Sequence, residues 1–190
     1  HYVSTAREHG IAFNYLLNAA NLGGTEQTRA GQKRIRRLLD WVAASGAQGV
    51  TVASPYLLRV IKRHYPSLRV KVGVFAVVDN PIKARRWEEL GADEICLSAI
   101  ACNRDFEKLE KIRSSVRCGL QLILNASCLL HCTHELTHMN LLSQSSRTGE
   151  PLGGFCMDYC ILHCSRRRLQ DPVNFIRAIW IRPEDLHHYE

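Results

Sequence analysis

Two kinds of hydrophobic pattern alternate along the N-terminal part of the chain. Short, continuous apolar runs such as 49–53 are typical of buried strands, whereas apolar residues that recur every three or four positions, as in 26–45, indicate amphipathic helices. Glycine follows two of the helical stretches, at Gly46 and Gly91, where it is favoured as a helix terminator. The pattern predicts a helix after each of the first four strands, and strands at 11–17, 49–53, 69–77, 94–98 and 120–124.

Alternating strands and helices predict an α/β fold with a parallel sheet, because consecutive parallel strands need crossover connections. A (β/α) barrel and an open doubly wound sheet both satisfy the pattern. No Gly-x-Gly-x-x-Gly follows a strand, which disfavours the nucleotide-binding version of the open sheet. Five strands are too few to close an eight-stranded barrel. We therefore expect an incomplete or modified (β/α) TIM-type barrel over 1–124, and a Cys-rich segment that continues the same domain over 125–190.

Polar residues before the predicted helices suggest where these helices begin. Ser54 and Asn80 each precede a proline, which combines a side-chain cap with a residue favoured at the first helical position. Asn103 precedes the next helical pattern and is expected to cap it in the same way.

The chain carries a net charge of +7, and its basic residues are clustered. Most clusters are best explained as solvated helix faces, but Arg166, Arg167 and Arg168 adjoin the Cys-rich segment and are the strongest candidates for contacting RNA. No apolar run approaches the ~18 residues of a membrane span, and no charged-then-apolar leader is present. A cytoplasmic location is therefore expected, with no membrane span.

Eight cysteines without a secretion signal favour metal binding or catalysis over a disulfide framework. Two pairs share a spacing of four residues, which on a helix or tight turn returns both side chains to one side. The predicted metal ligands are Cys128, Cys132, Cys160 and Cys164, with Cys156 as an alternative ligand. The other three cysteines lie in scaffold segments and are expected to be buried as small apolar residues: Cys96, Cys102 and Cys118.

The four predicted thiolate ligands are compatible with more than one metal. Iron–sulfur clusters are held by four cysteine thiolates, whereas structural zinc sites also use four cysteines but more often with a two-residue gap within each pair. We favour the iron–sulfur cluster, and zinc or unligated redox thiols remain as alternatives.

A second metal motif lies between the two cysteine pairs. His134, Glu135 and His138 match His-Glu-x-x-His, in which two histidines bind zinc and the glutamate activates water. The longer form of this motif continues with a glycine and a third histidine, and neither follows at the required spacing here. A zinc-dependent peptidase is therefore kept as the alternative function and is not the favoured one. His138 also belongs to a set of candidate catalytic residues near the cysteines, together with Asn125 and Asn140.

The cysteine pairs belong to four short motifs in which the sequence resembles the collagenase-like peptidases of family U32. The motifs are Asn125-x-x-Cys128-x-x-x-Cys132, His138-x-Asn140-Leu141, Asp158-Tyr159-Cys160-x-x-x-Cys164 and Trp180-Ile-Arg-Pro-Glu-Asp-Leu186-x-x-Tyr189-Glu190.

The resemblance implies a modified barrel with its site at the cysteine-bearing end. Family members include proteins of oxygen-independent ubiquinone hydroxylation and of RNA-base hydroxylation, and several carry a 4Fe–4S cluster. By resemblance, the ligands here would be Cys128, Cys132, Cys160 and Cys164. The expected function is thus to perform or support the oxygen-independent modification of a small molecule or RNA base. A non-catalytic binding subunit is a further alternative, and a protein partner or second copy is expected to complete the barrel.

Overall fold

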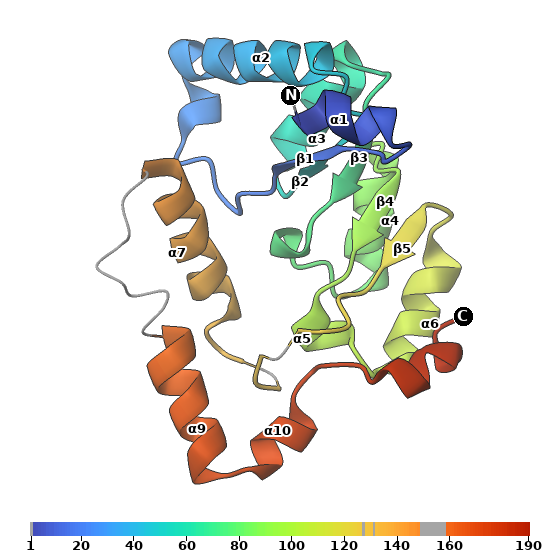
Figure 1. Ribbon diagram of the computed structural model, residues 1–190, viewed down its shortest axis with the longest axis vertical. Coiled ribbons are helices and arrows are strands. Elements are labelled where there is room, and N and C mark those ends of the chain that lie inside the picture. Colours follow the sequence, from blue (N-terminus) through green and yellow to red (C-terminus); the bar gives the residue numbers. More distant parts are fainter. Residues whose placement is uncertain (1, 127, 131, 149–158) are drawn as a thin grey trace.

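The computed structural model describes residues 2–126, 128–130, 132–148 and 159–190, and shows a mixed α/β fold (Figure 1). All neighbouring strands pair in parallel, and their spatial order follows the chain from β1 to β5. This order lacks the reversal that defines a doubly wound sheet. The strands are β1 (Asn14–Leu17), β2 (Gly49–Val52), β3 (Arg69–Val72), β4 (Glu94–Cys96) and β5 (Gly119–Gln121).

The crossover helices pack on one face of this sheet. Strand residues in matching register, including Val52, Val72 and Ile95, are fully buried and share one apolar cluster with Leu58 of α3 and Ile112 of α6. The helices before and between the strands are α1 (Tyr2–Glu8), α2 (Arg29–Ala44), α3 (Pro55–His64), α4 (Pro81–Glu89), α5 (Ala99–Cys102) and α6 (Phe106–Ser115).

The opposite face of the sheet is polar. Thr51, Lys71 and Glu94 alternate with the buried residues along β2, β3 and β4, and the Lys71 ammonium lies 2.8 Å from the Glu94 carboxylate. The Thr51 hydroxyl accepts a 2.5 Å hydrogen bond from the Asn14 amide of β1. The two faces therefore differ sharply in character, with one core on the helical side.

Most predicted strands are longer than the observed ones. The strand predicted at 69–77 ends at Val72, and the 3-10 helix η2 (Val74–Ala76) follows. Val77 closes η2 with a φ of 49°, a left-handed conformation that a regular strand does not contain. The apolar run continues through this turn because the turn itself is partly buried, so hydrophobicity alone placed the strand end too late.

The cap predictions were right at Asn80 and wrong at Asn103. The Asn80 side chain accepts a 3.0 Å hydrogen bond from the Lys83 N–H and so caps α4. Helix α6 is instead capped by Asp105, and the buried Asn103 amide donates to the carbonyls of Ile123 and Ile179. Ser54 precedes Pro55 at the start of α3 as predicted, although its side chain makes no capping hydrogen bond.

The C-terminal part of the chain lies beside the carboxyl ends of the strands (Figure 1). No helix in the described ranges combines the length and apolar character needed to cross a membrane. The remaining elements are the 3-10 helices η1 (Thr25–Gln27) and η4 (Pro183–His188), the π-helix η3 (Tyr159–Cys164), and the α-helices α7 (Glu135–Thr148), α9 (Ser165–Gln170) and α10 (Val173–Arg177).

Candidate metal centre

Helix α7 is fastened to the carboxyl edge of the sheet by three hydrogen bonds. The Ser98 hydroxyl, just beyond β4, donates to the Glu135 carboxylate at 2.9 Å. Beyond β1, the Ala20 N–H donates to the Ser143 hydroxyl at 2.6 Å, and the Asn21 amide donates to the Asn140 side-chain oxygen at 2.7 Å. These contacts fix the segment that follows Cys132 against the end of the sheet where chemistry occurs in parallel α/β folds.

The two cysteine-bearing segments meet at this end of the molecule. The ring of His134, two residues after Cys132, packs edge-on against the ring of His163 with centroids 5.5 Å apart. Burial raises the pKa of Cys164, and the nearby Cys132 thiol raises it further. A thiol that feels the charge of another lies within electrostatic range of it. The structure therefore brings Cys132 and Cys164 together from distant parts of the chain.

The other predicted ligands are described less completely. Cys128 is exposed, and its carbonyl accepts a 3.4 Å hydrogen bond from the Ile179 N–H. Cys160 belongs to the π-helix η3, an element that often marks functional sites. Cys156 lies outside the described residues. The described residues contain no set of three or more His, Cys, Asp or Glu placed to hold a metal ion, so the four-cysteine site remains a prediction.

Arginines of α9 supply positive charge beside Cys164. Arg168 and Arg167 act to lower the pKa of this thiol, although burial and Cys132 outweigh them. The Arg168 Nε is buried without a hydrogen-bond partner in the described part of the chain. A buried N–H group without an acceptor could donate to an anionic sulfur. Hydrogen bonds to sulfur set the reduction potential of iron–sulfur clusters. The donor chemistry thus fits a thiolate-bound metal group.

A clamp behind the cysteine segment was not apparent from the sequence. Asn103 donates to the Ile123 carbonyl at 2.9 Å and to the Ile179 carbonyl at 2.7 Å. Arg104, in a left-handed conformation with φ 65°, donates to the carbonyls of Ile176, Arg177 and Ala178. Through these hydrogen bonds, the clamp joins the chain that leaves β5 to the C-terminal segment. The left-handed backbone of Arg104 marks the clamp in the structure, but no sequence pattern predicts it.

The three scaffold cysteines are distinct from the candidate ligands. Cys96 and Cys102 are buried as predicted, and burial raises the pKa of Cys102 to about 11. Cys118 is partly buried, and burial, followed by the adjacent Glu88 carboxylate, raises its pKa to about 11. These thiols are poor sources of thiolate near neutral pH.

The predicted catalytic residues occupy different surroundings. Both polar atoms of the Asn140 amide are used in holding α7, because its oxygen accepts from Asn21 and its nitrogen donates to the Leu136 carbonyl. Asn125 is exposed in the turn after β5, and His138 is partly buried in the first turn of α7. A catalytic role for these residues stays a prediction, as does zinc binding by His134 and His138.

The Glu135 carboxylate is held in a partly buried position at the start of α7. Burial raises the pKa of Glu135 above its ordinary value of 4.5, and the Asp79 carboxylate adds to this effect. Ser98 and the Lys83 ammonium act in the opposite direction without cancelling it. The folded protein therefore binds the Glu135 proton more tightly than the unfolded chain does.

Replacing Glu135 with glutamine should remove a pH-dependent contribution to stability. This contribution is fully present below pH 4.5 and is lost as the pH rises through the higher pKa of the folded state. Glutamine keeps an acceptor for Ser98, so the melting temperature of Glu135→Gln relative to wild type should rise between acidic and neutral pH. Circular-dichroism melts over a pH series measure this trend, with Glu184→Gln as a control for the loss of one exposed carboxylate. A constant difference at every pH would contradict it.

Comparison with known proteins identifies the family. The sequence model described as peptidase family U32 matches residues 3–174. The chain belongs to peptidase family U32. This confirms the resemblance found in the sequence. The U32 match includes α7 and both cysteine segments, but it ends at residue 174. It therefore leaves out residues 176–181, which the clamp holds, and the motif at 180–190.

Two similar proteins support the assignment. The chain is 30% identical over 188 residues to "Uncharacterized protease MJ1657" of Methanocaldococcus jannaschii, an alignment that covers 99% of this chain and 55% of the relative. The solved structure of the U32 peptidase Mk0906 superposes with a TM-score of 0.70 at 30% identity, covering 77% of this chain and 59% of that one. The chain thus spans about half the length of the curated relative it matches.

Proposed function

We propose that this U32 protein holds a 4Fe–4S cluster with Cys128, Cys132, Cys160 and Cys164. The observation that carries the proposal is the meeting of the two cysteine segments, shown by the His134–His163 ring contact and by the electrostatic coupling of Cys132 with Cys164. Four thiolates are the usual ligands of such a cluster. Zinc held by the same cysteines is the competing assignment.

The proposed role is to carry out or support an oxygen-independent modification, such as hydroxylation, of a small molecule or RNA base. When bound, the cluster would supply one-electron transfer or a Lewis-acidic iron. The chain's own residues would shape its surroundings. Arg167 and Arg168 would offset the negative charge of the thiolates, and α7 would hold the Cys132 side of the site against the sheet.

The proposal also covers the completion of the barrel and the compartment in which the protein works. Sequential parallel order with the crossover helices on one face of the sheet is the arrangement expected of a segment of a (β/α) barrel. We propose that further strands, from the remainder of a longer chain, a protein partner or a second copy, pair with the edges of β1 and β5 to complete the barrel. A reducing cytoplasm would suit the thiolate ligands.

Metal analysis of protein purified without oxygen tests the cluster directly. The expected result is a brown protein with broad absorption in the visible range and about four irons and about four sulfides per chain. Stoichiometric zinc, or reduced thiols without iron after anaerobic purification and reconstitution, would contradict the proposal. The salt dependence of RNA retention then separates an RNA substrate from an uncharged small molecule.

A zinc-dependent peptidase is the second candidate. It is favoured by the His-Glu-x-x-His sequence at the start of α7, and by the names of the two relatives, one called a protease and the other a peptidase. It requires Glu135 to face a zinc-bound water, whereas in the structure this carboxylate accepts a hydrogen bond from Ser98. Zinc-dependent hydrolysis of casein that is lost in Glu135→Gln would establish this candidate.

A further inference from the structure

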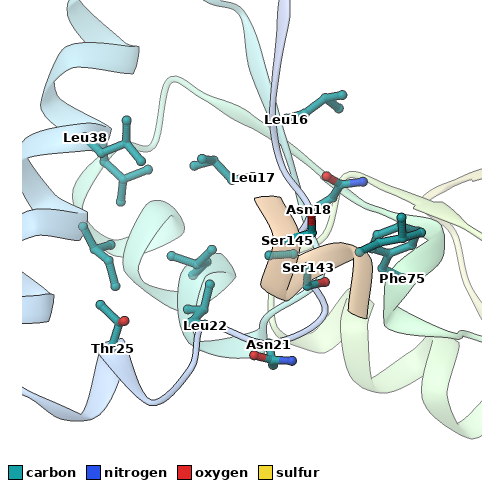
Figure 2. Close-up of a pocket in the computed structure, with 15 residues that line it drawn as sticks. Leu16, Leu17, Asn18, Asn21, Leu22, Thr25, Leu38, Phe75, Ser143 and Ser145 are labelled. Carbon is teal, nitrogen blue, oxygen red and sulfur yellow. The ribbon is translucent and has the colours of Figure 1, made fainter. Parts of the chain in front are cut away.

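A cavity of about 730 Å³ lies between α7, α2 and the loop that follows β1 (Figure 2). Its walls include residues of β1, α2, α3, η2 and α7, and no cysteine or histidine lines it in the part of the chain that the structure describes. The volume falls within the range of about 300–1,000 Å³ that is usual for small-molecule sites. The cavity is therefore large enough for a ligand and separate from the candidate metal centre.

The lining is aliphatic at one end and polar at the other. Leu17, Leu22 and Leu38 lie on the α2 side, and Asn18 and Ser145 lie on the α7 side near Phe75 (Figure 2). Among the described residues, every polar side chain that lines the cavity is an uncharged amide or hydroxyl. Transfer of an ionised ligand group into such a site, without a charge to pair it, is strongly unfavourable.

The polar end retains hydrogen-bonding capacity in the amide of Asn18. The Ser143 hydroxyl is already engaged with the Ala20 N–H and the Met139 carbonyl, and the Asn21 amide is engaged with Asn140 and the Gly23 N–H. The Asn18 amide makes no hydrogen bond with the part of the chain that the structure describes, and it faces the polar end of the cavity in Figure 2. It offers both a donor and an acceptor.

We propose that this cavity binds a neutral amphiphile, with an aliphatic body packed against the leucines of β1 and α2. An uncharged head, such as a hydroxyl, ester or amide, would hydrogen-bond to Asn18. The proposal depends on the shape and charge of the lining and not on the cysteines, so it stands or falls independently of the cluster.

Binding can be measured with Nile red, an uncharged dye whose fluorescence rises in apolar surroundings. We expect saturable binding of one dye per chain and displacement by 1-decanol. Decanoate and decylammonium, below their micelle concentrations, should compete at least about tenfold less well because their charges would be desolvated. Equal competition by the charged analogues, or dye binding that does not saturate, would overturn the proposal.

Variants of the two walls locate the site. Leu142→Gln on α7 and Leu38→Gln on α2 should each weaken dye binding by about five- to tenfold, because a polar group replaces part of the apolar wall. Leu136→Gln is the matched control, since Leu136 is exposed on α7 and does not line the cavity. The control should bind like wild type. Full dye affinity in both wall variants, with native circular dichroism, would overturn the assignment.

The head-group contact has its own test. Asn18→Ala should reduce the affinity for 1-decanol by about five- to tenfold, because it removes a hydrogen bond to the hydroxyl. The same variant should leave Nile red binding nearly unchanged. Unchanged decanol affinity would overturn the assignment of Asn18. Iron and sulfide content should match wild type in all these variants, which separates a failure of this proposal from a failure of the cluster proposal.

Discussion

Alanine at Cys132 or Cys164 will abolish the iron and sulfide content of the anaerobically purified protein, together with its visible absorption. A 4Fe–4S cluster with four protein thiolates loses an iron–protein bond when any one of them is removed. These two positions are the sharpest tests because the ring contact of His134 with His163 brings their two segments together. Cys128→Ala and Cys160→Ala are expected to have the same effect.

Cys118→Ala is the matched control for these variants. It removes a partly buried thiol of the scaffold, whose raised pKa of about 11 makes it a poor ligand. This variant should retain the full iron and sulfide content, as should Glu135→Gln. A full complement of iron in both Cys132→Ala and Cys164→Ala would exclude the proposed ligand set. The iron content of Cys156→Ala then tests the alternative ligand: a loss of iron would indicate that Cys156 binds the cluster, and a full iron content would exclude it.

Asn103→Ala should destabilise the protein by about 2–4 kcal/mol. The substitution removes two hydrogen bonds and leaves the carbonyls of Ile123 and Ile179 without their donor, and a buried unpaired carbonyl costs about 1–3 kcal/mol. For a chain of this size, the melting temperature should fall by roughly 4–16 °C. Urea unfolding followed by circular dichroism measures the free energy of unfolding.

Two further variants separate the donor role of Asn103 from its packing. Asn103→Asp keeps the side-chain size but points a carboxylate at two carbonyls, so it should be at least as destabilising as alanine. Asn174→Ala removes a partly buried amide from α10 whose 3.2 Å hydrogen bond to the Arg167 carbonyl is exposed to solvent, and it should change stability by less than about 1 kcal/mol. Trypsin should cleave after Arg177 sooner in the Asn103 variants, because the segment around this residue loses its anchor. Equal stability of Asn103→Asp and wild type would contradict the clamp.

The sheet was largely predictable because its strands carry apolar side chains at alternate positions, between amphipathic helices. Val50, Val52, Val70 and Val72 identify two buried strands from sequence alone, since full burial on the helical face needs an apolar side chain at every second position. Strand ends were less predictable. The turn at Val74–Ala76 is itself apolar, and only the backbone conformation shows that the strand has ended.

The sequence proposes the candidate ligands, but it does not predict the contacts that support the segments carrying them. Spacing alone paired Cys128 with Cys132 and Cys160 with Cys164. The contacts that hold the site involve residues far apart in the chain, such as Ser98 with Glu135. Asn103 shows why such contacts escape sequence reasoning. Its position suggested a local helix cap, but its amide is used in a long-range clamp that no local pattern encodes.

The clamp also has a consequence for the order of events during biosynthesis. A ribosome releases the strands and crossover helices before it makes residues 176–181, so the sheet can fold while the backing of the cysteine loop is still missing. Only after this segment emerges can Asn103 and Arg104 fasten it behind the loop. Metal loading at the predicted ligands would therefore wait until residues 176–181 have emerged, and would take place on an already folded sheet.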